Sequence, residues 1–398
     1  MSTVPSADLL RVFLDCGRCD GEYLRQNVGF VDYVRDRASA DFHVLVTTQE
    51  TGGGGLSWTV RFMGAGRFGG QEQTLAFTTD ATATEDDRRR AFARIFKLGM
   101  ASSAAGTSAA PALDVTWRPP SQASDLMRAH DPWNYWVFTA RVNSNMDGEK
   151  SRSSKAYDLR LSADRTTESL KLAFSVGGNR RNNSFEVGEG ERLVTETHTW
   201  NIKGGAAKSL GPHWALGTTG AVSHSSFSNI DRSIGAAPAI EYNLFPYSDS
   251  SHRTLTFQYA AGATKYRYSE LTIFDKTEEV IPRQALNVAL NLRQPWGSLG
   301  ASSNFSQHLN APGRYRAEVW GEAEVRLFKG FSIEVFTEYN RINDQVALRK
   351  QDASQEEVLL RLRQLATGYS YYMSFGISYR FGSIFNNVVN TRMDHTSF

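Results

Sequence analysis

Residues 369–381 alternate strictly between two kinds of side chain. The even-numbered positions are small or carry a polar group, and the odd-numbered positions are apolar or aromatic: Tyr369, Tyr371, Met373, Phe375, Ile377, Tyr379 and Phe381. A period of two residues predicts a β-strand with one apolar face. A tilted strand of about this length can cross a bilayer, with aromatic residues at both interfaces. A strand of a soluble sheet fits the same pattern, so the other residues have to distinguish the two.

Alternating segments recur throughout residues 133–382. About twelve can be counted, an even number, as single-chain bacterial barrels require. In the clearest one, 315–327, apolar residues alternate with charged ones. A soluble sandwich needs a second layer to cover such faces, whereas lipid covers them in a membrane barrel. The predicted strands are 134–145, 157–164, 170–179, 193–204, 214–226, 234–244, 255–268, 284–293, 299–307, 315–327, 331–340 and 369–381.

The loops between these segments add an independent indication. Short connections (165–168, 210–213, 294–297 and 328–330) alternate with long ones (182–191, 269–283 and 344–368). Outer-membrane barrels show this alternation, with short periplasmic turns and long external loops. With an even number of strands, both chain ends then face the periplasm, including a tail at 383–398. The loop 344–368 carries a helical pattern after Ser354, which fits either a cover over the barrel mouth or a surface helix.

Residues 1–100 predict a small domain of different character. The expected order is strand 10–15, helix 20–37, strands 42–48, 56–63 and 74–79, and a helix capped by Thr84. Acidic residues follow Thr84, where the helix dipole favours them. Residues 101–132, rich in Ala, Ser and Pro, predict a linker. The fold class is therefore α+β: a βαβββα two-layer periplasmic domain, then an antiparallel transmembrane barrel.

Overall composition excludes some functions. A net charge of +2 with 22% charged residues does not suit a nucleic-acid-binding surface. No apolar run approaches the roughly 20 residues of a membrane helix, so a membrane role requires a barrel. Residues 1–10 lack a basic start followed by an apolar run, so we expect a mature chain or a misassigned start. No cofactor or metal site is expected.

Cys16 and Cys19 form a C-x-x-C pair between a predicted strand and helix. The setting resembles thioredoxin, in which such a pair is a redox couple. Thioredoxin-like domains also place a cis-proline opposite the pair, and no proline lies between Pro5 and Pro111. A structural periplasmic disulfide is therefore favoured, with a redox couple, free thiols or metal binding as alternatives. Two cysteines alone do not make a zinc site.

A second motif, residues 64–69, matches G-x-G-x-x-G. A dinucleotide site needs a helix to begin there, but residues 73–79 are strand-like. We interpret the glycines as a turn or bulge.

His224 and Ser226 stand near the outer end of the fifth predicted membrane strand. The pair resembles the His-x-Ser arrangement of outer-membrane phospholipase A and the lipid A deacylases, in which His is the general base for a Ser nucleophile. Those families have Asn after the Ser, whereas this chain has Phe227, with Asn229 nearby. The alternative is that both are polar residues at the end of a membrane strand.

The face opposite the apolar one carries charges of both signs. Paired ladders of Arg and Glu between strands are what a closed, filled barrel interior would use, whereas a selective channel would favour a ring of one sign. The mixed charges therefore favour a narrow or plugged lumen. The predicted lumen charges are Arg316, Glu318, Glu322, Glu324, Arg326, Glu334 and Glu338.

The last strand also carries a resemblance. Ser374, Gly376, Tyr379 and Phe381 are similar to the terminal β-signal that the barrel assembly machinery recognises, although residues 382–398 follow it. Residues 361–392, Asp15 and residues 34–47 resemble a group of uncharacterised outer-membrane barrel proteins of Gram-negative bacteria. Residues 10–100 are similar in element order to the amino-terminal domain of the Tol-system propeller protein and of curli-export lipoproteins.

The resembling group of barrel proteins brings no established activity. Our first hypothesis is a non-enzymatic protein in contact with outer-membrane lipid, acting as a pore, an export or assembly component, or an envelope scaffold. Its periplasmic domain would be free to bind an envelope protein. The alternatives are a surface lipid hydrolase that uses Ser226 and His224, and a chain that is entirely soluble.

Overall fold

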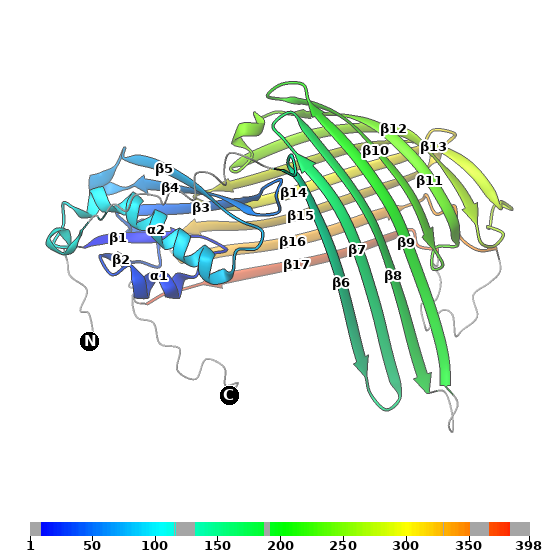
Figure 1. Cartoon of the computed structure of the whole chain (residues 1–398), viewed down its shortest axis with the longest axis horizontal. Coiled ribbons are helices and arrows are strands. Elements are labelled where there is room, and N and C mark those ends of the chain that lie inside the picture. Colours follow the sequence, from blue (N-terminus) through cyan, green and yellow to red (C-terminus); the bar gives the residue numbers. More distant parts are fainter. Residues whose placement is uncertain are drawn as a thin grey trace.

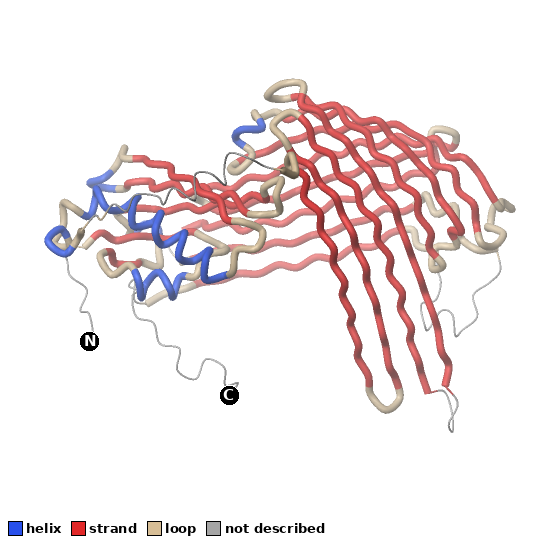
Figure 2. The backbone as a smooth tube through the Cα atoms, in the orientation of Figure 1, coloured by secondary structure: helices blue, strands red, loops and turns tan. Residues whose placement is uncertain are grey.

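The computed structural model describes residues 9–114, 116, 132–186, 192–328, 330–350 and 366–382. It contains a five-stranded sheet and a twelve-stranded sheet (Figures 1 and 2). The helical pattern after Ser354 and the tail 383–398 lie outside the described residues. Neither α-helix in the described part is long and apolar enough to cross a membrane.

The amino-terminal domain is built on the five-stranded sheet, in the order β2-β1-β3-β4-β5. Strand β1 pairs in parallel with β2 and β3, and the other pairs are antiparallel. A 3₁₀ turn, Gly66–Phe68, lies between β4 and β5, so the glycine motif is a turn as predicted. The elements are β1 Leu10–Asp15, α1 Gly21–Asn27, β2 Val31–Tyr33, β3 Phe42–Glu50, β4 Leu56–Gly64, β5 Glu72–Thr79 and α2 Glu85–Ala104.

The predicted helix over 20–37 was wrong beyond Asn27. Asp20 caps α1 by accepting a hydrogen bond from the backbone N–H of Tyr23 at 2.8 Å, but the helix ends after seven residues. Gly29 follows, and glycine costs a helix interior about 1 kcal/mol relative to alanine. Residues Val31–Tyr33 instead pair with β1 and are buried. Pairing with a distant strand outweighs the local helical spacing of the valines.

The two helices cover one face of the five-stranded sheet, which gives the predicted two-layer arrangement (Figure 2). Thr84 and Asp87 form a capping box at the start of α2, and Phe92, Phe96 and Met100 are buried on its inner face. The core continues in β4, with Trp58 and Phe62 almost fully buried. Alternation along β1 and β3 directs the side chains of Phe13, Asp15, His43, Leu45 and Thr47 to the opposite face, which no helix covers.

Gly99 of α2 lies against Phe62, and a Cβ there would be 2.2 Å from the Phe62 Cζ atom. Gly99→Ala gains about 1 kcal/mol of helix propensity but overpacks the core at a cost of about 1–3 kcal/mol. We expect a net loss, seen as faster hydrogen exchange of α2 and β4 amides in the full-length protein. The exposed Ser102→Ala on the same helix should leave exchange unchanged. Equal or slower exchange in Gly99→Ala would contradict the packing argument.

The twelve-stranded sheet is antiparallel throughout, with neighbours in sequence also neighbours in space. All segments predicted as membrane strands are strands, several of them longer than predicted. Their bounds are β6 Trp136–Gly148, β7 Arg152–Thr166, β8 Leu170–Glu186, β9 Arg192–Ser209, β10 Trp214–Ser225, β11 Ile230–Asn243, β12 Arg253–Tyr268, β13 Glu278–Gln294, β14 Gly297–His308, β15 Ala311–Phe328, β16 Phe331–Ile342 and β17 Tyr369–Tyr379.

Register separates the two faces of this sheet. Val319 lies opposite Tyr339, which lies opposite Tyr371, and all three belong to what we call the apolar face. Glu318, opposite Asn340, belongs to what we call the polar face. The apolar side chains are exposed: Tyr371 by 71%, Phe375 by 62% and Val142, on β6, by 76%. Nothing in the described part of the chain covers the apolar face.

The sheet curves strongly, and β6–β9 run at a steep angle to β14–β17 (Figure 1). Small residues at the middle of β9–β12 permit this bend. A Cβ on Gly262, for example, would lie 2.1 Å from the carbonyl oxygen of Ala236, so no side chain fits. Among the described strands no pairing joins β6 to β17, so the closed ring of the predicted barrel is not observed.

Candidate functional site

A cavity of about 610 Å³ lies on the polar face of the large sheet. Its lining residues come from strands as far apart as β7 and β13, which is possible only because the sheet curves around this face. Small side chains such as Ala173 and Ala221 leave the space open, and Asp164, Lys203 and Arg283 add charges of both signs. The polar face is therefore the concave side of the sheet, and it encloses open space.

The predicted lumen charges lie on this face, but not as a ladder of Arg–Glu pairs between strands. Glu322 lies opposite Phe336, and Glu324 opposite Glu334. The ion pairs along β15 are instead local, with Arg316 3.4 Å from Glu318 and Arg326 3.4 Å from Glu324. In the described ranges Glu322, Glu334 and Glu338 take part in no ion pair. Charge pairing thus concentrates at the two ends of β15.

At the end of the sheet away from the amino-terminal domain, which we call the outer end, Arg316 binds the segment 343–350 that follows β16. Its guanidinium donates to both carboxylate oxygens of Asp344 at 2.9–3.1 Å. Two residues further on, Val346 is buried against Tyr268 and Ile281. These partners belong to β12 and β13, so the segment lies across the outer end of the sheet. Residues 344–350, the start of the long loop 344–368, therefore pack at this end of the sheet.

Other loops strengthen this outer cover. Asn229 is 2% exposed, and its amide donates to the carbonyl oxygens of Glu270 at 3.1 Å and Ala347 at 2.9 Å. Arg349 donates to the carbonyl oxygen of Ser226 at 2.8 Å and pairs with Glu270 at 3.0 Å. The sequence indicates only that Asn229 stands near Ser226. Its hydrogen-bond partners come from loops far along the chain, so they were not predictable.

Ser226 and His224 are not assembled as a nucleophile and base. Ser226 follows the last residue of β10, and its hydroxyl donates to the carbonyl oxygen of His198 at 3.2 Å and accepts from the His198 N–H at 3.0 Å. His224 directs Nδ1 to the carbonyl oxygen of Asp231 at 2.8 Å. No hydrogen bond joins the two side chains in the described structure, and the lipid-hydrolase alternative gains no support.

The opposite end of the sheet meets the amino-terminal domain. Asp15, at the end of β1, accepts two hydrogen bonds from the guanidinium of Arg326, one of them from Nη2 at 3.0 Å. His43 of β3 places Nε2 3.3 Å from the same carboxylate. Phe13 lies 5.7 Å beneath the Arg326 guanidinium. The uncovered face of the small sheet thus contacts the end of the polar face through a charged pair.

The charge of Asp15 is maintained by its partners. Burial acts to raise the pKa of this carboxyl, but hydrogen bonds from His43 and Arg326 outweigh burial and hold the pKa below its usual 3.8. A carboxyl with a depressed pKa contributes stability above its unfolded-state value and loses it as the pH falls through the lower folded-state value. The contact with Arg326 is therefore fully charged at neutral pH.

Further hydrogen bonds between domain and sheet are made by exposed groups. Arg293 of β13 donates to the carbonyl oxygen of Thr48 at 3.0 Å, and the Gln49 amide donates to the Ser250 hydroxyl at 3.0 Å. Arg35 donates to the carbonyl oxygens of Phe381 at 3.1 Å and Gly382 at 3.4 Å. Phe381, assigned to the last strand in the sequence analysis, lies just beyond β17, which ends at Tyr379.

A second cavity, of about 710 Å³, lies between the domain and strands β13–β17. Asp15, Asp36 and Thr47 line it from the domain side, and Glu324 and Glu334 line it from the sheet. The Asp36 Oδ2 and Thr47 Oγ1 atoms are buried and have no hydrogen-bond partner in the described protein. Buried polar atoms without protein partners are typically hydrated. The junction therefore encloses a polar chamber, around which the domain and the sheet are only partly in contact.

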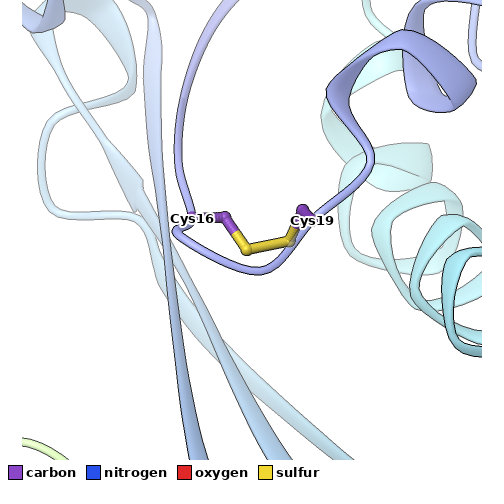
Figure 3. The surroundings of a disulfide bond; sticks show 2 residues. All are labelled: Cys16 and Cys19. Atoms are coloured by element: carbon purple, nitrogen blue, oxygen red, sulfur yellow. A yellow bond between two sulfur atoms is a disulfide. The ribbon is translucent and has the colours of Figure 1, made fainter. Parts of the chain in front are cut away.

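Cys16 and Cys19 form a disulfide at the edge of this chamber, in the turn between β1 and α1 (Figure 3). Both sulfurs pack against the domain core. In the described residues no group of three or more His, Cys, Asp or Glu side chains could hold a metal ion. The pairing is the one favoured by the sequence, and it braces the turn directly after Asp15.

No protein-family model and no curated protein matches this chain. Among solved structures, the NanC porin aligns with 10% identity and a TM-score of 0.30, covering 61% of this chain and all of the porin. The translocator domain of autotransporter NalP from Neisseria meningitidis aligns with 12% identity and a TM-score of 0.26, covering 65% of this chain and 93% of that domain. The beta domain of the Bordetella autotransporter BrkA aligns with 13% identity and a TM-score of 0.25, covering 62% and 98%. At these scores, function has to be argued from the chain's own geometry.

Proposed function

We propose that the chain is an integral outer-membrane β-barrel whose polar face lines a pore. The observation that carries this proposal is the large sheet with two unlike faces, of which the apolar one has no cover in the chain. Monomeric soluble proteins rarely expose contiguous apolar patches of more than a few hundred Å². Here exposed apolar side chains extend from Val142 on β6 to Phe375 on β17. Lipid is the partner whose chemistry matches such a band.

Membrane insertion also explains how the sheet would be completed. Strands β6 and β17 each have one edge without a partner strand in the described chain. In hydrocarbon each unsatisfied backbone group costs several kcal/mol, so spanning sheets close on themselves. We therefore propose that β6 pairs with β17. With an even number of strands both chain ends would then face the periplasm, and the amino-terminal domain would lie on that side.

The last strand supports delivery by the barrel assembly machinery. Ser374 and Gly376 lie on the polar face of β17, and Tyr379 on its apolar face. Phe381 follows at the proposed edge of the membrane, so the four residues stand in the order of the β-signal. This assignment makes the machinery and outer-membrane lipid the expected partners.

A pore accounts for the polar face better than a filled scaffold does. The first cavity is open and lined mostly by small side chains. On β15 and β16 register sets Glu324 opposite Glu334, so the polar face is not filled by Arg–Glu pairs between these strands. Segment 343–350 packs at one end of the polar face, and the amino-terminal domain packs at the other. A barrel used only as an anchor needs neither the space nor the covers.

Single-channel recording of the full-length protein in planar bilayers tests the pore. We expect small, rare openings in the unchanged protein, because segment 343–350 covers the outer end. Arg316→Gln removes the charged hydrogen bonds to Asp344, each worth about 1.5–3 kcal/mol. It should increase the open fraction about tenfold or more. Arg341→Gln, on the opposite face of the neighbouring strand, is the matched control and should change nothing. Silence in both variants would argue against a pore.

A further inference from the structure

We propose that the amino-terminal domain is a gate, held across the periplasmic end of the pore by the Asp15–Arg326 ion pair. This inference rests on the pore proposed above. It assigns a function to the uncovered face of the five-stranded sheet, which would otherwise have none.

The position of the contacts supports a gate over a tether at one edge. They involve Ser250 between β11 and β12, Arg293 on β13, Arg326 on β15 and Phe381 after β17. The domain therefore reaches strands distributed across half of the large sheet. Arg326 belongs to the polar face, so its bond to Asp15 lies on the side that would line the pore. A domain seated in this way blocks passage at that end.

The nature of the contacts supports reversible docking. Asp15–Arg326 joins two charged side chains, both largely shielded from solvent, and the other hydrogen bonds across the junction are made by exposed groups. Between them lies the polar chamber, where Asp36 and Thr47 keep buried polar atoms without protein partners. The chamber leaves part of the facing surfaces of domain and sheet without direct contact. The docked state therefore depends on its one strong pair.

The core of the domain is separate from the large sheet. Between α2, which ends at Ala104, and β6, which begins at Trp136, the chain makes the single covalent link from the domain to the sheet. The domain core is closed by its own helices and disulfide. Release would expose the polar chamber but would leave this core intact.

Charge reversal and charge exchange in the full-length protein test the gate by two readouts. The first is the open fraction in planar bilayers. The second is the yield of cross-linking between Gln49→Cys and Ser250→Cys with a short bis-thiol reagent, which reports docking without any current. The native cysteines are paired with each other and do not compete.

We expect Asp15→Arg to raise the open fraction at least tenfold and to lower the cross-link yield. Arg326→Gln should act in the same direction from the sheet side, which guards against a local folding defect around Asp15. Combining Asp15→Arg with Arg326→Asp should restore both readouts. Asp80→Arg, an exposed carboxylate of the same domain, is the control for added charge and should change neither. Cross-linking position 49 to position 250 in the Asp15→Arg protein should lower the open fraction again.

The outcomes separate the two proposals. Conductance that stays constant while the cross-link yield falls overturns the gate and leaves the pore standing. A cross-link yield unaffected by either charge variant overturns the role of the ion pair. If the charge variants lower the cross-link yield, and neither they nor Arg316→Gln conducts, both the pore and the gate are overturned.

Discussion

Val319→Arg should destabilise the inserted protein by about 2–4 kcal/mol, the cost of an arginine facing lipid near the bilayer midplane. Val319 lies midway along β15 on the apolar face, between Ser303 and Tyr339 of the neighbouring strands. A guanidinium there has no charged partner and must displace lipid or draw in water. The free energy of unfolding is measured by urea titration in lipid vesicles, with resistance to protease as the signal for folded protein.

Glu322→Arg is the matched control for Val319→Arg. It places the same side chain on the same strand but on the polar face, near Glu324. We expect a change within about 0.5 kcal/mol, the usual range for substitutions away from packed sites. Equal destabilisation by the two variants would show that the apolar face does not meet lipid. An apolar face buried by a protein partner would predict dissociation of that partner instead.

Trp58→Ala should strongly destabilise the amino-terminal domain. Trp58 is 2% exposed, stacks on Phe77 and Phe92 with ring centroids 5.4 and 6.2 Å apart, and donates its indole N–H to the Thr79 hydroxyl at 3.1 Å. Truncating a buried Trp costs about 3–5 kcal/mol. Domains of this kind are stable by about 5–15 kcal/mol in total. Hydrogen exchange should therefore rise throughout β3–β5 and α2.

The controls for Trp58→Ala come from the same site and from the other domain. Trp58→Phe keeps the aromatic packing and loses the hydrogen bond, at a cost of about 1 kcal/mol. Exchange in β6–β17 should stay the same in both variants, because the large sheet has its own hydrogen-bond ladder. Unchanged protection of β3–β5 in Trp58→Ala would refute the packing argument.

The large sheet was predictable strand by strand because its signal is local. Alternation along each segment sets which side chains share a face, and turn residues set where strands end. The register then follows from short connections, as between β15 and β16, where Arg326 meets Ser332 across a tight turn. The small domain was harder to predict. The valine spacing before β2 fits a helix locally, and only parallel pairing with β1 shows that Val31 belongs to a strand.

The candidate site was predicted in composition but not in pairing. The sequence correctly predicted that Glu318, Glu322, Glu324, Arg326 and their neighbours share one face. It could not predict their partners, since Asp15 and Arg326 are 311 positions apart and Arg316 reaches Asp344 in a loop. The ladder expected between strands fails because register brings Glu324 opposite Glu334.

The strands, their two faces, the cysteine pair and the division into two parts were determined by the sequence alone, because period, turn chemistry and spacing act over a few residues. Tertiary structure decided the rest: that the sheet bends at its small residues, that Ser226 and His224 turn to separate backbone partners, and that Asp15 finds Arg326. These outcomes depend on contacts between distant segments, whose energies are comparable to one another and cannot be ranked from local pattern. For the same reason the strand 369–379 was identifiable from its own residues, whereas the domain packed at the end of the sheet was not.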